Sequence, residues 1–111
     1  MTFTIKQGDT APALKATLKR GGGEPVDLTA AENIQFLLED GLQGVLIEDD
    51  LSGNVSLVNA PNGVVQYTWE EGDTETTGQK QAEFVVDFES GKTETFPNND
   101  YIYITIQNRI E

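Results

Sequence analysis

Most of the side chains that commonly carry out enzymatic chemistry are missing from this chain of 111 residues. It contains no histidine and no cysteine, which excludes Ser-His-Asp and Cys-His catalysis, thiolate metal ligands and disulfide bonds. The serines Ser52, Ser56 and Ser90 lack the S-x-x-K spacing of a serine–lysine dyad. The glycine run at 21–23 lacks the Gly-Lys-Ser/Thr sequence and the helix of a phosphate-binding loop.

Carboxylates are therefore the main candidates for chemistry, and the chain has 19 of them. Two carboxylates can hydrolyse a glycosidic bond, but no pair is singled out by its spacing. Oxygen ligands in the segments 48–50 (Glu-Asp-Asp) and 70–73 (Glu-Glu-Gly-Asp) would suit Ca²⁺, although neither segment matches the EF-hand pattern. We favour solvated acidic loops over a metal site. The sequence thus predicts a protein that is not an enzyme and holds no cofactor or metal.

The charge of the chain limits its partners. A formal net charge of −12 repels nucleic acids and anionic lipids, so we expect neither as a ligand. Adaptation to high salt is an alternative to an ordinary acidic surface, because about 1 M salt shortens the screening length to about 3 Å.

The positive charge is concentrated in residues 1–20. Lys15 and Lys19 are expected on the outer face of the second strand, with Arg20 beside them. These three residues either protect a sheet edge from unwanted strand pairing or form a basic patch that docks onto an acidic neighbour. Both interpretations stay open at this level.

The elements that must position these side chains are short strands. Apolar and polar residues alternate in about eight segments at roughly ten-residue spacing, which is typical of an antiparallel β-sandwich. Pro61-Asn62-Gly63 predicts a hairpin turn, residues 27–32 predict one helical turn with a capping box, and 70–79 predict a polar loop. An open barrel is the structural alternative. We expect one domain over residues 1–111.

Two groups of large side chains need separate explanations. Trp69 shares the inner face of its strand with Tyr67, so we expect it in the core, although an exposed ring would suit sugar stacking. The alternation places another group opposite the core, where it would form either ordinary cross-strand pairs or a protein-binding patch. Its members are Leu37, Val85, Tyr101 and Tyr103.

The sequence also predicts where the protein is made. No run of 18 apolar residues occurs, so we expect no membrane span. The segment Met1-Thr2-Phe3-Thr4-Ile5-Lys6 lacks the apolar region of a secretory signal. We expect a protein that stays in the cytosol or is assembled into a particle there.

Several motifs follow one another in an order that resembles the N-terminal immunoglobulin-like domain of tailed-phage baseplate upper proteins. They are Gln7-Gly8-Asp9-Thr10-Ala11-Pro12, Pro25-Val26-Asp27-Leu28-Thr29, Tyr67-Thr68-Trp69, Ala82-Glu83-Phe84 and Thr95-Phe96-Pro97.

This resemblance implies an immunoglobulin-like sandwich that acts as a virion scaffold, assembling in symmetric rings or attaching receptor-binding modules to a tail. Family members continue into further domains, whereas this sequence stops at Glu111, so a head decoration, a turret or a tail accessory is also expected. With the acidity, the resemblance predicts a virus of a salt-loving host. Partners would be other virion proteins and copies of itself, and a host-surface or glycan-binding module is the alternative.

Overall fold

The computed structural model describes residues 1–41 and 44–110, and every regular element within them is a strand. The chain folds into an immunoglobulin-like β-sandwich, which confirms the predicted fold class. The nine described strands are β1 (Thr2–Lys6), β2 (Leu14–Thr17), β3 (Ala31–Asp40), β4 (Gly44–Asp49), β5 (Val55–Asn59), β6 (Val64–Tyr67), β7 (Gly78–Phe88), β8 (Thr93–Phe96) and β9 (Ile102–Gln107).

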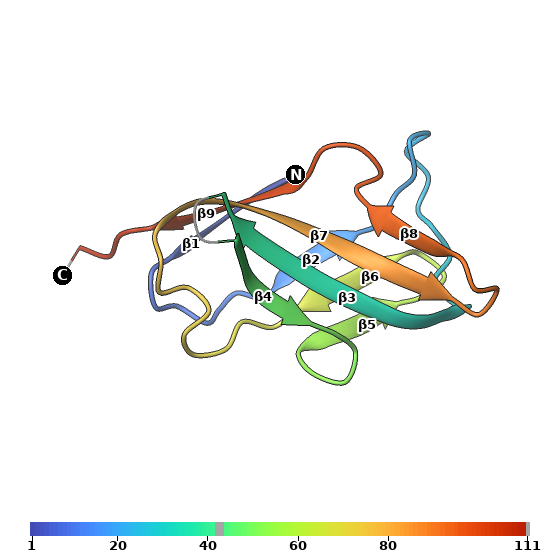
Figure 1. The fold of residues 1–111 in the computed structure, drawn as a ribbon, viewed down its shortest axis with the longest axis horizontal. Helices are drawn as coiled ribbons and strands as arrows, with labels where there is room; N and C mark the ends of the chain where they lie inside the picture. The colour runs from blue at the N-terminus through green and yellow to red at the C-terminus, as the bar shows by residue number, and fades with distance from the viewer. Residues whose placement is uncertain (42–43, 111) are drawn as a thin grey trace.

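The strands form two sheets that pack face to face (Figure 1). The larger sheet has the order β1-β9-β7-β3-β4, and β8 pairs with β7 beyond the end of β9. The smaller sheet has the order β2-β6-β5. All pairs are antiparallel except β1 with β9, which is parallel. Strands β1 and β4 therefore lie at the edges of the larger sheet, and β2 and β5 at the edges of the smaller one.

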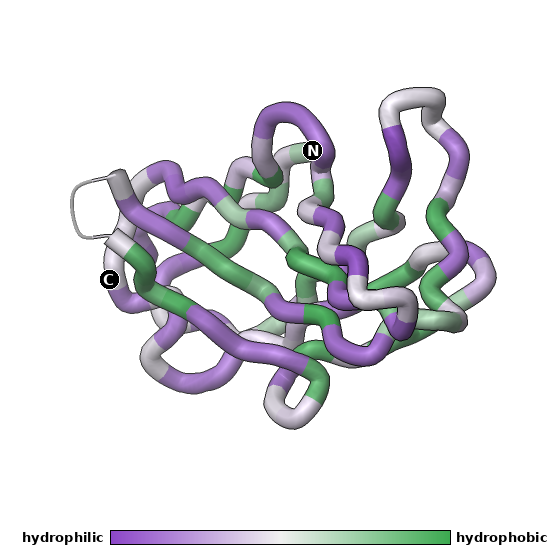
Figure 2. The backbone as a smooth tube through the Cα atoms, turned by 45° about the vertical axis from the view of Figure 1, so that its right-hand side comes forward, coloured by the Kyte–Doolittle hydropathy of each residue, from purple (hydrophilic) through white to green (hydrophobic). Residues whose placement is uncertain are grey.

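The core lies between the sheets because alternate side chains of each strand point inward. Figure 2 shows the corresponding alternation of hydrophobic and hydrophilic segments along the strands. Aromatic rings join the two layers: Phe36 of β3 stacks on Tyr67 of β6 with ring centres 4.4 Å apart. Phe84 lies 5.1 Å from Phe36 on the same side. These contacts fix how the smaller sheet is placed on the larger one.

The hairpin turn predicted at Pro61-Asn62-Gly63 is confirmed by the structure. The β5–β6 hairpin closes with a hydrogen bond from the Gly63 N–H to the Ala60 carbonyl, 3.1 Å long, and Gly63 has a φ of 69°. Asn62 next to it does not need a positive φ. Strand β8 ends at Phe96, whose ring is fully buried, and Pro97 follows.

The predicted helical turn at 27–32 is wrong. Asp27 accepts hydrogen bonds from the Thr29 N–H and hydroxyl at 2.9 and 2.6 Å, which closes a short side-chain turn in place of a helix cap. Strand β3 then begins at Ala31, opposite Phe88 of β7. Strand pairing with β7 offers more hydrogen bonds than one isolated helical turn, which is marginal in water.

The alternation also misplaces a residue of β4. Strict alternation would place Val45 and Ile47 on the same face of the strand, but Ile47 is buried and Val45 is 61% exposed. The β3–β4 register shifts between Leu38 and Glu39, so this bulge turns the strand over.

The predicted polar loop at 70–79 is too long at its C-terminal end. Strand β7 begins at Gly78, because residues 78–82 pair with β9 from Ile106 to Ile102. That pairing joins residues 20 to 28 positions apart, so local composition does not reveal it.

Candidate interaction surfaces

The outward side of β3, β4 and β7 forms the first candidate surface, called here the acidic face. It is defined by Leu37, Glu39, Val45, Glu48, Glu83 and Tyr101. Cross-strand pairing places Leu37 between Glu48 and Glu83. Tyr101, which is 39% exposed, and the exposed Val45 line a shallow hollow with Leu37. Apolar side chains are thus surrounded by carboxylates.

The predicted outward group lies on this sheet but is not one patch. Val85 is half-buried between Gln35 and Thr95 on neighbouring strands. Tyr103 lies over a separate hollow with Glu39, and its hydroxyl donates a hydrogen bond to Asp100. That bond raises the pKa of Tyr103. Only Leu37 and Tyr101 of the four predicted residues come together.

The outward side of the smaller sheet differs in charge and is called here the basic face. It is defined by Lys15, Lys19, Ser56, Val58 and Gln66. Lys15 pairs across the sheet with Gln66, and Gln66 pairs with Ser56. Lys15 and Lys19 are exposed, as predicted. Strands β2, β5 and β6 contain no acidic residue at all.

Arg20, unlike Lys15 and Lys19, forms an ion pair. Its guanidinium donates to both carboxylate oxygens of Glu94 on β8, at 2.7 and 2.9 Å. These bonds hold the pKa of Glu94 below, and that of Arg20 above, the usual range. Arg20 therefore connects β8 to the turn after β2, which leaves its charge largely compensated.

The acidic segments 48–50 and 70–73 are joined by a hydrogen bond, but carboxylate oxygens in both segments accept hydrogen bonds from backbone N–H groups. Asp49 accepts hydrogen bonds from the N–H groups of Asp50 and Asn54 at 2.9 and 3.0 Å. The Asn54 side chain donates to Glu70 at 2.9 Å and so joins the two loops. Within the described residues, no group of three or more acidic side chains is placed to hold a metal ion. The arrangement acts as a scaffold for the loops.

The second loop is also fixed to the core. The buried Tyr67 hydroxyl donates to Asp73 at 2.6 Å, and the Glu70 N–H donates to the same oxygen at 2.9 Å. Burial, followed by this hydrogen bond, raises the pKa of Tyr67. The phenol therefore stays protonated to a higher pH than that of an ordinary tyrosine.

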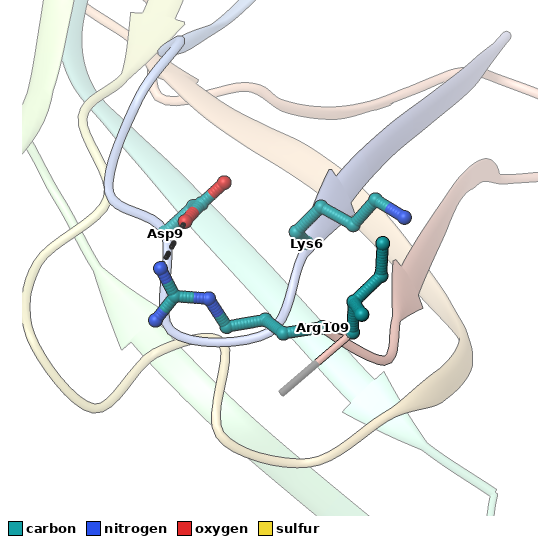
Figure 3. Close-up of a pocket in the computed structure, with 4 residues that line it drawn as sticks. Lys6, Asp9 and Arg109 are labelled. Atoms are coloured by element: carbon teal, nitrogen blue, oxygen red, sulfur yellow. Dashed lines mark ion pairs between the residues drawn. The ribbon is translucent and has the colours of Figure 1, made fainter.

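A third surface feature lies where β1 and β9 end (Figure 3). Lys6, Asp9, Arg109 and Ile110 line an open hollow, and Arg109 lies 4.0 Å from Asp9. Among residues 1–41 and 44–110, Asp9 is the one carboxylate of this hollow, and a convergent acid pair of the kind that a glycosidase uses is not formed by them. Across the described residues, the carboxyl pKa values that shift are lowered, as at Asp27, Asp50 and Glu94, and a general acid needs the opposite.

Trp69 is 3% exposed, which confirms the predicted core position and removes the ring that the sugar-binding alternative required. It packs at right angles to Tyr67, with ring centres 5.2 Å apart. In the described part of the chain its indole nitrogen is buried without a hydrogen-bond partner.

Sequence reasoning missed Lys80, the most unusual polar residue of the core. Its side chain is 1% exposed, and its ammonium group contacts Asp40 at 2.8 Å and the Thr77 carbonyl at 2.9 Å. The available signal was its position: Lys80 precedes Ala82, Phe84 and Val86 in the inward register of β7. The pair joins the start of β7 to the end of β3.

No protein-family model matches the chain, and no curated protein matches it significantly in sequence. Solved structures with a similar fold exist. CopC from Methylosinus trichosporium OB3b matches with a TM-score of 0.56 at 10% identity, covering 99% of this chain and 87% of CopC. Murine CRIg matches with a TM-score of 0.45 at 12% identity, covering 97% of this chain and 92% of CRIg. At 10% identity the likeness to CopC concerns the fold alone.

Proposed function

We propose that this protein is a structural component of a tailed-virus particle that acts through protein–protein contacts in a multi-copy assembly and has no catalytic role. The link to tailed viruses rests on the order of motifs from Gln7 to Pro97, which resembles baseplate upper proteins. The proposed positions are the baseplate, the tail, or a head decoration or turret.

The acidic face is the single observation that carries the contact role. Val45 and Tyr101 are 61% and 39% exposed next to each other, and Leu37 extends the apolar area between two glutamates. An apolar centre with a polar rim is the arrangement of protein interfaces, and tyrosine is favoured at such sites. The exposed side chains of this surface contribute little to the packing of the core. Partner binding would explain why large apolar side chains occupy these exposed positions.

The proposed location is the virion, assembled in the cytoplasm of the host. The strongly acidic composition supports a host that lives in high salt, where the self-repulsion of a chain with net charge −12 is screened. No helix in the described residues is long and apolar enough to cross a membrane.

The test is quantitative mass spectrometry of virions purified from the source of this gene. We expect the chain in many copies per particle. Replacing Val45 and Tyr101 by serine should reduce incorporation, whereas serine at Ile110, which is fully exposed outside the acidic face, should not. Circular dichroism would confirm that both variants fold. Absence from virions, or full incorporation of the Val45/Tyr101 variant, would contradict the proposal.

A further inference from the structure

We propose that copies of this protein stack face to back, with the basic face of one copy binding the acidic face of the next. This inference rests on the proposed function, because it names a second copy of the chain as the partner of the acidic face. The two faces belong to opposite sheets of one sandwich, so each copy has both halves of the contact.

The first argument is the separation of charge between the two sheets. In β3, β4 and β7 the single basic residue is Lys80, which is buried and paired with Asp40. The outward positions of these strands include Glu39, Glu48 and Glu83. Strands β2, β5 and β6 have one charged residue, Lys15. In a chain with 19 acids and 7 bases, a sheet without acids is a marked departure from the average.

The second argument is that these charges are available. Within residues 1–41 and 44–110, Lys15 and Lys19 form no ion pair, and neither do Glu39 and Glu83. Arg20 differs because Glu94 already holds its guanidinium. The basic face therefore offers two unpaired ammonium groups, and the acidic face offers unpaired carboxylates around its apolar centre. Complementary charges of this kind select the partner and fix its register.

The third argument is apolar exposure on both sides. Val45 and Tyr101 on the acidic face are matched by Val58 of β5 on the basic face, which is 47% exposed. Contact between the faces would remove these three side chains from water, which is favourable in proportion to the area covered. Charge supplies the specificity and apolar burial supplies the attraction.

The symmetry of the contact follows from its two different halves. A contact between unlike faces repeats from copy to copy and produces a closed ring or an open stack. Edge protection is the competing explanation for Lys15 and Lys19, since β2 is an edge strand. Under edge protection the lysines keep copies apart, so reversing their charge would not reduce association.

The test is a charge exchange followed by sedimentation velocity. Lys15→Glu/Lys19→Glu makes both faces acidic, and Glu39→Lys/Glu83→Lys makes both basic. Each substitution shifts the net charge by two units, and each variant carries two substitutions. The net charges are therefore −16 and −8, compared with −12 for the parent chain. We expect the parent protein to associate within a series from about 0.15 to about 1 M KCl, because added salt screens the long-range repulsion between copies more strongly than the contacts across the interface. At the same salt concentration we expect each variant to associate at least about tenfold more weakly.

The decisive sample is an equimolar mixture of the two variants, in which every acidic face finds a basic one again. We expect the mixture to recover the association of the parent protein. Lys92→Glu/Arg109→Glu is the control for Lys15→Glu/Lys19→Glu, because both variants carry the same net charge and because Lys92, at the β7–β8 turn, and Arg109, after β9, lie outside both faces. It should leave association unchanged, and circular dichroism should show every variant folded.

Three results would overturn the inference: a parent protein that stays monomeric over the salt range, face variants that associate like the parent, or a mixture that remains monomeric. None of them bears on incorporation into virions, which tests the proposed function separately. A protein found in particles but monomeric in this assay would keep the function and lose the stacking.

Discussion

The buried ion pair between Lys80 and Asp40 provides the sharpest test of how this fold is held together. The Lys80 side chain is 1% exposed and that of Asp40 is 15% exposed, with nitrogen and oxygen 2.8 Å apart. Replacing Asp40 by asparagine keeps the shape but removes the negative charge. The ammonium group then keeps the Thr77 carbonyl, 2.9 Å away, as a neutral acceptor.

The expected cost follows from leaving a buried charge without its counter-charge. Breaking a buried pair in this way costs about 3–5 kcal/mol, and the partial exposure of Asp40 places this case at the lower end, about 3 kcal/mol. In a chain of 111 residues, about 2.1 cal/mol/K of unfolding entropy per residue converts that cost into a fall of about 13 °C in Tm. Replacing both partners removes the charge altogether, so Asp40→Asn/Lys80→Met should recover most of the loss.

The assay is thermal and urea unfolding followed by circular dichroism, at constant salt. Lys92→Met is the matched control, since Lys92 is exposed and its replacement should change the free energy of unfolding by less than about 0.5 kcal/mol. A cost below about 1 kcal/mol for Asp40→Asn would refute the reasoning, because that is the value of an exposed pair. So would a double variant as unstable as the single one.

Two further predictions concern the β5–β6 hairpin and the core tyrosine. Gly63→Ala would place a Cβ 2.6 Å from the Val26 carbonyl oxygen, whereas Gly91→Ala, also at positive φ, meets no atom within 4 Å. Thermal unfolding should show a cost of about 1–2 kcal/mol at Gly91 from backbone strain and about 2 kcal/mol more at Gly63 from the overlap; equal costs would contradict this. The raised pKa of Tyr67 means that its contribution is fully present below about pH 10 and is lost as pH rises further. Tyr67→Phe should therefore lose less stability than the parent between pH 9 and 11 in urea titrations, and parallel curves would count against it.

The contact surfaces and the core are built from separate sets of residues. The rings that join the sheets, such as Phe36 and Tyr67, point inward. Val45, Tyr101 and Lys15 point outward and contribute little to packing. Changes to the proposed faces should therefore leave the fold intact, which is the condition that makes the charge exchange interpretable.

Much of the fold was predictable from local patterns. Alternation with a period of two identified the inward side of β2, β3, β6, β7 and β9, and Gly63 marked a true hairpin. The failures have one cause in common, since each depends on a partner strand distant in sequence. The register shift next to Leu38 turned Val45 outward, β9 extended β7 back to Gly78, and pairing with β7 replaced the expected helical turn at residues 27–32.

The candidate surfaces were predictable in part. The outward positions of Leu37, Tyr101, Lys15 and Lys19 were predicted from alternation and are confirmed. Their grouping was not predictable, because neighbours across a sheet depend on which strands pair and in which register. Sequence alone grouped Tyr101 with Leu37, Val85 and Tyr103, whereas the structure places Tyr101 with Leu37 and Val45.

The sequence by itself determined the all-β class, the absence of histidine and cysteine chemistry, and the excess of negative charge, because these follow from composition and from a two-residue period. Only the tertiary structure decided that Arg20 is occupied by Glu94, that Lys80 is buried against Asp40, and that one sheet is free of acids while the other is lined with them. The physical reason is that charge pairing and surface patches depend on distances between residues far apart in the chain. Those distances are set by which strands pair with one another and in which register.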